Sequence, residues 1–218
     1  MTKSMPVIAV DGPAAAGKGT LAKSLAEAFS LPYLDTGLLY RAVGRRMLDA
    51  GLDPATASGE ELAMALSPDD LKRTDLRTPD ATRAASLVAR DQAVRQALVH
   101  IQRSFAAERG GVLDGRDIGT VIFPDADVKL YITASPRTRA ERRYTQTGGS
   151  ETGPDRETDI SKVETALIER DKADATRAAA PLRMADDAVK IETDTLTAEQ
   201  VLTEAIRIVK SVLDAKAF

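Results

Sequence analysis

The stretch G-P-A-A-A-G-K-G-T has the G-x-x-x-x-G-K spacing of a phosphate-binding loop, but Gly19 follows the lysine and the hydroxyl comes one residue later, at Thr20. Glycines let the backbone fold tightly and turn its N–H groups inward onto an anion. A helix that begins at the loop points its positive end at the same place. Lys18 would add a mobile cation for the β- and γ-phosphates, and the Thr20 hydroxyl an oxygen near a magnesium ion, directly or through water. The stretch predicts a nucleoside triphosphate site formed by Gly12, Pro13, Ala14, Ala15, Ala16, Gly17, Lys18, Gly19 and Thr20.

The surroundings of the loop favour this interpretation over a chance glycine-rich turn. The apolar run V-I-A-V precedes the loop, and Leu21, Leu25 and Ala28 follow it at helical spacing. The loop alone does not distinguish a kinase from a switch or a motor. A GTPase switch is expected to carry Asn/Thr-Lys-x-Asp. The one Lys-x-Asp of this chain, at 172–174, follows Asp171 instead, which weakens that alternative.

Arginines far from the loop suit a second phosphate. Transfer between two nucleotides needs both phosphates held in line and their charge offset. Four stretches carry arginines that could bind and neutralise an acceptor phosphate, namely D-T-G-L-L-Y-R (Asp35–Arg41), L-D-G-R-D-I-G-T (Leu113–Thr120), R-T-R-A-E-R-R (Arg137–Arg143) and E-R-D-K-A-D-A-T-R-A-A-A-P-L (Glu169–Leu182).

Two of these stretches follow predicted strands. Asp35 comes after Tyr33-Leu34, and Arg116 and Asp117 come after Val112-Leu113. The carboxyl ends of parallel strands are where open α/β sheets bind ligands, which favours a site over an ordinary polar loop. Thr36 is expected to cap the following helix.

The other two stretches have helical spacing. Arg139, Arg142 and Arg143 share one predicted face, which is either a solvated basic helix or part of a lid. The polar segment 145–160 is expected to be a mobile loop, which favours a lid that excludes water from the transfer. A second predicted face carries either phosphate and sugar ligands or an exposed salt-bridge ladder: Arg170, Asp174 and Arg177.

Strands and helices alternate along the chain, which predicts a parallel sheet of about five strands covered by helices on both faces. Further strands are expected near 128–132 and 188–191, and an amphipathic helix over 91–108. Thr197 and Gln200 have capping-box spacing before the last helix. Residues 49–80, rich in Asp, Ala, Thr and Pro, are expected to form short helices on an arm.

Composition limits the function classes. The 218 residues fit one domain, and the net charge of −3 disfavours a nucleic-acid binder that acts through a global basic field. Disulfides and thiolate metal sites are excluded because there is no cysteine; the single histidine, His100, is expected to be structural or without a role. No signal peptide and no apolar run of membrane-spanning length is visible. We expect a soluble, cytoplasmic, monomeric protein that binds neither nucleic acid nor membrane.

These motifs, in this order, resemble the bacterial cytidylate kinase family. The resemblance rests on the phosphate-binding loop, D-T-G-L-L-Y-R, T-P-D-A-T-R-A-A-S-L-V-A-R with V-R-Q-A-L, D-G-R-D-I-G-T-V-I-F-P-D-A and E-R-D-K-A-D-A-T-R-A-A-A-P-L, from Val7 to about Val209. The loop is shared with adenylate kinases, which would show Asp-Gly-Phe-Pro-Arg in place of D-G-R-D. The resemblance implies an α/β P-loop kinase domain over 1–218, with an NMP-binding arm at about 37–89 and a lid with flanking helices at about 136–178.

The resemblance also implies transfer of the γ-phosphoryl group of ATP to CMP or dCMP, with Mg²⁺. Lys18, Arg139, Arg143 and Arg177 would stabilise the transferred group. Cytosine offers an N4 donor and acceptors at N3 and O2, so a carboxylate and donor side chains could distinguish it from uracil. The implied substrate ligands are Thr36, Ser86, Arg95 and Asp117 for the base, Arg41, Arg116 and Arg177 for the monophosphate, Arg170 and Asp174 for the sugar, and Tyr40.

Two departures from the family pattern stand out. Thr36 occupies a position that is often serine, and the arm between Arg41 and Ser86 shows no alternating strand pattern, so a small three-stranded insert common in the family is expected to be missing. The alternatives are a P-loop kinase for another small acceptor, such as UMP, AMP or shikimate, and a non-catalytic nucleotide-binding regulatory module.

Overall fold

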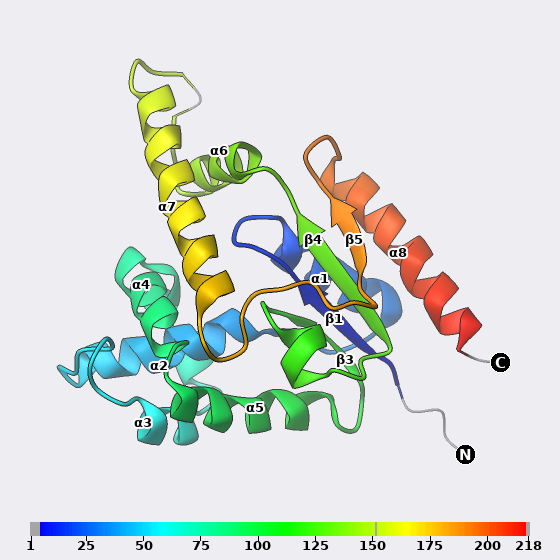
Figure 1. The fold of residues 1–218 in the computed structure, drawn as a ribbon, viewed down its shortest axis with the longest axis horizontal. Helices are drawn as coiled ribbons and strands as arrows, with labels where there is room; N and C mark the ends of the chain where they lie inside the picture. Colours follow the sequence, from blue (N-terminus) through cyan, green and yellow to red (C-terminus); the bar gives the residue numbers. More distant parts are fainter. Residues whose placement is uncertain (1–4, 151, 217–218) are drawn as a thin grey trace.

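Five short strands form one parallel sheet at the centre of the structure, a computed structural model that describes residues 5–150 and 152–216. The spatial order is β2-β3-β1-β4-β5, and every neighbouring pair is parallel (Figure 1). The prediction of a parallel five-stranded sheet is therefore confirmed. The strands are β1 (Val7–Asp11), β2 (Tyr33–Asp35), β3 (Gly111–Asp114), β4 (Val128–Thr133) and β5 (Val189–Glu192).

Helices cover both faces of the sheet because the strand side chains alternate between two apolar clusters. Ile8 and Val10 of β1 pack with α1 (Lys18–Phe29) and α8 (Ala198–Ala215). Ala9 packs on the opposite face, with α5 (Gln92–Ala106) and the π-type turn η3 (Ile118–Ile122). The predicted capping box of α8 is present, since the Thr197 side chain accepts from Gln200 N and the Gln200 side chain accepts from Thr197 N.

The arm that follows β2 is built from helices and short helical turns, as predicted. Its longest helix, α2, packs so closely on α4 that a Cβ added at Gly44 would lie 2.7 Å from the Cβ of Ala84. The described residues of the arm form no strand, which fits the expected loss of the three-stranded insert. The elements are α2 (Thr36–Asp49), α3 (Glu60–Met64), η1 (Asp70–Lys72), η2 (Thr74–Arg77) and α4 (Pro79–Val88).

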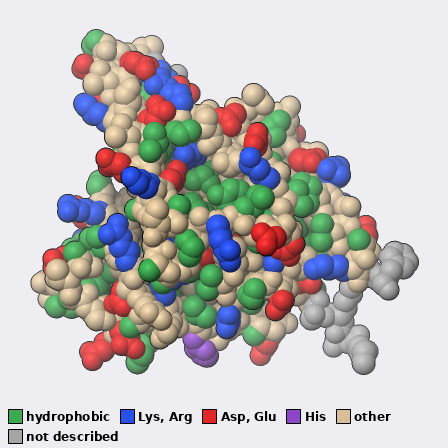
Figure 2. Space-filling model, in the orientation of Figure 1, with side chains coloured by type: hydrophobic (Ala, Val, Ile, Leu, Met, Phe, Trp, Pro, Cys, Tyr) green, Lys and Arg blue, Asp and Glu red, His purple; other side chains and the backbone are tan. Residues whose placement is uncertain are grey.

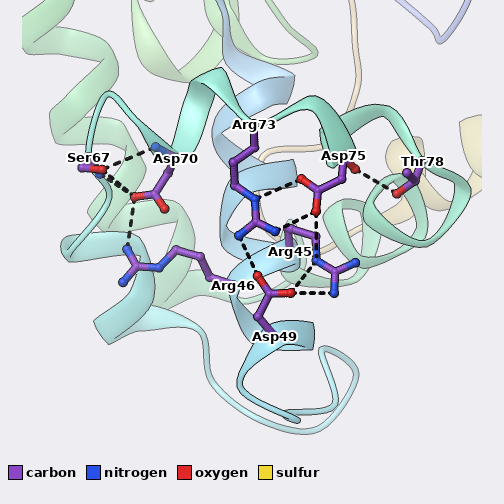
Figure 3. A network of polar contacts seen from close by, with 8 residues as sticks. All are labelled: Arg45, Arg46, Asp49, Ser67, Asp70, Arg73, Asp75 and Thr78. Atoms are coloured by element: carbon purple, nitrogen blue, oxygen red, sulfur yellow. Dashed lines mark hydrogen bonds and ion pairs between the residues drawn. The ribbon is translucent and has the colours of Figure 1, made fainter.

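Ion pairs fasten the segment 67–78 onto α2 (Figure 3). Arg73 lies between Asp49, at 2.6 Å, and Asp75, at 2.7 Å, and Arg45 also pairs with Asp49 at 2.7 Å. Arg46 lies 3.4 Å from Asp70. A hollow of about 610 Å³ adjoins this network. Because its arginines are already paired with carboxylates, the hollow is a poor phosphate site.

A second projection is formed by the segment between α6 (Pro136–Gln146) and α7 (Arg156–Thr176) with the first turns of α7, which stand out from the rest of the molecule (Figures 1 and 2). Ala140, Ile160 and Leu167 pack there with Ala14 of the phosphate-binding loop. The predicted loop over 145–160 is wrong at both ends, because 145–146 belong to α6 and 156–160 to α7. The first turn of α7 is polar and masks the helical spacing that begins at Ile160.

Acidic and basic side chains are interspersed over the face seen in Figure 2. In the described part of the chain, no helix is long and apolar enough to cross a membrane. His100 is exposed on α5.

Candidate active site

The loop between β1 and α1 has the geometry that anion binding requires. Gly12 and Gly17 have φ values of 143° and 91°, and a Cβ at Gly12 would lie 2.0 Å from the carbonyl oxygen of Ile132. Only glycine fits this close approach without strain. α1 begins at Lys18, so its first N–H groups have no partners within the helix and are available to a phosphate. Lys18 Nζ curls back to donate to the Pro13 carbonyl at 2.9 Å, while Thr20, two residues further on, is exposed.

Carboxylates surround the buried Lys18. Asp114 Oδ1 lies 3.8 Å from its Nζ, and Asp11 and Asp35 contribute further negative charge. Burial, followed by the charge of Arg116, lowers the pKa of Lys18 to about 8. Asp114 is the register partner of Asp35 at the ends of β3 and β2. Sequence reasoning missed Asp11 and Asp114, although both are acidic residues that end a buried strand.

A second cluster gathers residues that lie far apart in the sequence. The Asp117 carboxylate bonds to Arg95 through one oxygen, and the other oxygen lies 3.4 Å from Arg177 Nη2. The Arg95 guanidinium lies over the ring of Tyr40, 5.6 Å from its centroid. The side chains of Arg95, Asp117 and Arg177 are each only 6–7% exposed. Burial raises the pKa of Asp117 and lowers that of Arg177, and the ion pairs oppose both shifts. Four predicted substrate ligands thus share one site.

A group of arginines occupies the space between this cluster and the phosphate-binding loop. Arg116 Nε pairs with Asp174 Oδ2 at 3.1 Å. Among the described residues, Arg41 Nη1 and Arg170 Nε are buried and have no hydrogen-bond partner. Burial, then the charge of Arg116, lowers the pKa of Arg170 to about 10, and Arg41 and Arg143 add to the repulsion. Burial also lowers the pKa of Arg41. These guanidinium groups are close enough to repel one another and have spare donors.

Two predicted residues, Thr36 and Arg177, take up positions that differ from the expectation. Thr36 is not the helix cap, because Asp35 precedes α2; the Thr36 hydroxyl instead donates to the Asp114 carbonyl at 2.7 Å. Arg177 does not continue the face of α7, because the helix ends at Thr176 and Arg177 has extended backbone angles. Ser86 donates to Thr82 O, 3.3 Å away within its own helix α4.

The three arginines of α6 that the sequence predicted to share a face reach three different places. Arg139 is buried, pairs with Asp171 of α7 at 2.6 Å and donates to the carbonyl of Ala14 at 3.2 Å. Arg142 donates to Thr193, to the hydroxyl at 2.8 Å and to the carbonyl at 2.6 Å. Arg143 contributes its charge to the group around Arg170. Arg139 therefore joins α6 and α7 to the phosphate-binding loop.

Arg77 is a further residue that sequence reasoning missed. Its Nη2 lies 3.3 Å from Asp35 Oδ2, and its charge helps to lower the pKa of Arg41. Nothing in the local spacing of η2 predicts this placement, which depends on how the arm folds back over α2.

A glycine-rich loop after the central strand of a parallel sheet, accompanied by arginines from α2, α6 and α7, defines the P-loop kinase class of fold. Within it, the chain belongs to the cytidylate kinase family, whose model matches residues 8–211. The chain is 55% identical to the cytidylate kinase of Acidiphilium cryptum, covering 95% of this chain and 96% of the relative. It is 53% identical to that of Granulibacter bethesdensis, covering 94% and 96%.

Solved structures support the fold. A gluconokinase from Sinorhizobium meliloti superposes with a TM-score of 0.54 at 15% identity, covering 99% of this chain and 98% of that one. At this identity, the similarity shows a shared fold and says nothing about the acceptor.

Proposed function

We propose that this protein is a kinase that transfers the γ-phosphoryl group of ATP to CMP or dCMP and releases ADP and the nucleoside diphosphate. Membership of the cytidylate kinase family supports this reaction. The observation that carries the acceptor site is a set of buried guanidinium nitrogens without a hydrogen bond, on Arg41, Arg95 and Arg170. Buried polar groups are nearly always satisfied, so these donors point to an anionic ligand.

The donor side is assigned to the loop 12–20. Its backbone amides would hold the β- and γ-phosphates. Lys18 would stabilise the negative charge that develops on the oxygen between these two phosphates during transfer. Arg139 already contacts this loop through the Ala14 carbonyl, which supports a role beside the donor phosphates. Its proposed role is to offset charge on the transferred group, together with Arg143 and Arg177.

The acceptor side is assigned to the arginines and the Asp117 cluster. Arg41 and Arg116 would bind the monophosphate, with Arg177 beside them, and Asp117 would accept from N4 of cytosine while Arg95 donates to the ring. Arg170 and Asp174 would meet the sugar; Thr36, Tyr40 and Ser86 would complete the pocket. An ionised phosphate is itself the nucleophile, so the reaction needs no strong general base.

The residues beside Lys18 also fit a magnesium ion. Asp114 and Asp35 supply carboxylate oxygens and Thr20 a hydroxyl, and Mg²⁺ is usually held by one or two carboxylates together with substrate phosphates. Among residues 5–150 and 152–216 there is no group of three acidic or histidine side chains suited to a metal, which agrees with an ion that is held largely by ATP. When bound, Mg²⁺ would neutralise charge on the β- and γ-oxygens.

The arm over about 37–89 and the lid over about 136–178 are proposed as mobile units that close on the substrates. Closing them would exclude water, which would otherwise accept the phosphoryl group. The monomeric state and the cytoplasmic location stay predictions.

A substrate panel tests the proposal. Steady-state rates with CMP, dCMP, UMP, AMP and GMP are measured at one concentration of ATP and Mg²⁺, with Lys18→Ala as the inactive control. We expect the highest kcat/KM for CMP or dCMP. Transfer to another acceptor at a higher kcat/KM would identify a different kinase. ATP hydrolysis without transfer to any acceptor would favour a regulatory module.

A further inference from the structure

Asp11 ends β1, directly before Gly12 of the phosphate-binding loop, and is only 5% exposed. Its Oδ1 accepts from the backbone N–H of Ile118 at 2.8 Å, and its Oδ2 accepts from that of Gly119 at 2.7 Å. These are the first amides of η3, which have no partner within the turn. A carboxylate that accepts from two backbone amides makes a strong, charge-assisted contact.

This contact continues the connection between β1 and β3 beyond the end of the sheet. The last backbone bond between them runs from Gly115 N to Val10 O at 3.0 Å. The chain then leaves the sheet through Arg116 and Asp117, and Asp11 fastens it again at the next residue. The two substrate-binding residues therefore lie between two attachments to β1, and the second attachment is a single side chain.

The packing around the contact leaves room for little else. A Cβ at Gly119 would lie 3.0 Å from Lys129 Cδ and 3.4 Å from Asp11 Oδ2, so glycine permits both neighbours. The ammonium of Lys129 donates to the Pro124 carbonyl and to Asp187, at 2.8 Å, rather than to Asp11. The Asp11 carboxylate is thus left to the two amides.

The charged and titratable groups nearest to Asp11 come from three elements. The charges of Lys18, on α1, and of Asp117 act directly on the Asp11 carboxylate. On β4, Tyr131 is the register partner of Asp11, and Lys129 lies beside Gly119. Burial raises the pKa of Asp11 to about 6, and the two amides oppose this shift. At pH 7 the carboxylate is largely ionised and can accept both bonds, whereas protonation would make one oxygen a donor.

We propose that Asp11 is a positioning residue for phosphoryl transfer, whose carboxylate holds the acceptor-binding segment of Arg116 and Asp117 at a fixed offset from the phosphate-binding loop. The inference depends on the proposed CMP kinase activity. In-line transfer is sensitive to such an offset, because a displacement of about 1 Å can cost about 100-fold in rate.

The variant Asp11→Asn tests this role, because it keeps the shape and one acceptor but turns a donor toward a backbone amide. We expect kcat with CMP to fall by about 10- to 100-fold, while the Kd of ATP, measured by calorimetry, stays within about threefold. Asp125→Asn, on the exposed segment after η3, is the matched control and is expected to keep wild-type kcat. A kcat of Asp11→Asn within threefold of wild type would overturn the proposal.

The pH profile separates positioning from a general loss of structure. The ratio of wild-type kcat to Asp11→Asn kcat is expected to fall toward 1 below pH 6, because protonation of Asp11 then removes a hydrogen-bond acceptor from the wild type as well. Both proteins use the same substrate, so the titration of its phosphate cancels in the ratio. A ratio that stays constant from pH 5 to 8 would contradict the proposal.

If Asp11→Asn does not fold, Gly119→Ala perturbs the same contact from the other side. It is expected to lower kcat with little change in the Kd of ATP, and a wild-type kcat in that folded variant would count against the proposal. A wild-type protein that does not phosphorylate CMP would instead refute the proposed function itself.

Discussion

Replacing Asp117 by asparagine distinguishes the contribution of this residue to stability from its proposed role in recognising cytosine. The carboxylate is buried between Arg95 and Arg177, one on each oxygen. Asparagine keeps the size of the side chain and removes its charge. Both guanidinium groups then stay buried without a counterion, and a donor faces the position where N4 of cytosine is expected.

Two magnitudes follow from this geometry. Removing one partner of a buried ion pair costs about 3–5 kcal/mol. At about 2–4 °C per kcal/mol for a chain of this size, Tm should fall by about 6–20 °C. For recognition, a buried carboxylate repels O4 of uracil, whereas the amide can donate to it. The lost hydrogen bond from N4 of cytosine to the carboxylate is worth about 1.5–3 kcal/mol, so the CMP/UMP ratio of kcat/KM should fall by about 10- to 160-fold.

The assay is steady-state kinetics with CMP and UMP below the Tm of the variant, together with thermal unfolding. Asp186→Asn, on the exposed segment after the lid, serves as the control and is expected to change neither quantity. If Asp117→Asn lowers Tm but leaves the CMP/UMP ratio unchanged, Asp117 only holds the arginines in place and the assignment to cytosine is wrong.

Further predictions concern the loop, the arm and its ion pairs. Because Lys18 has a pKa of about 8, it loses its proton as pH rises through that value, so the Kd of ATP should rise between pH 7 and 9.5; a constant Kd would contradict this. Gly44→Ala forces α2 and α4 apart, which should cost about 1–3 kcal/mol and about 2–12 °C in Tm, whereas Gly153→Ala, which meets open space, should cost almost nothing. Arg73→Ala should lower Tm more than Lys72→Ala, because Arg73 pairs with both Asp49 and Asp75 whereas Lys72 makes one exposed pair. The difference in Tm should shrink in 1 M NaCl, and an unchanged difference there would rule out screened ion pairs as the cause.

Local patterns in the sequence were sufficient for the parts of the fold that depend on local physics. β1 and the loop after it could be predicted because an apolar run, two glycines and a lysine are contiguous, and the start of α8 because Thr197 and Gln200 are three residues apart. The end of α7 could not be predicted, because Arg177 follows Asp174 at helical spacing although the helix ends at Thr176. There the Leu182 N–H bonds back to the carbonyl of Asp174 at 2.8 Å, a contact that spacing does not reveal.

The sequence indicated which residues could form the candidate site, but it did not indicate how their side chains pair with one another. The resemblance to a family identified Arg95 and Asp117 separately, and only the fold shows that they form an ion pair. Asp11 was overlooked because an acidic residue at a strand end has no distinctive spacing. Its partners are backbone amides more than 100 residues away, and no sequence pattern marks an amide as a partner.

The ion pairs of the arginines indicate which part of the acceptor nucleotide, its phosphate or its base, supplies most of the binding energy. Arg95, Arg116 and Arg139 each have a protein carboxylate as a close partner, so their positions are set before any ligand arrives. Arg41 and Arg170 instead lie among other guanidinium groups that repel them, and each keeps a buried nitrogen without a hydrogen bond, as Arg95 also does. A monophosphate carries about −1.5 to −2 charges near pH 7 and can relieve that repulsion, whereas cytidine brings no charge and cannot. The phosphate should therefore supply most of the affinity, and the base, held by side chains that are already paired, should supply the selectivity.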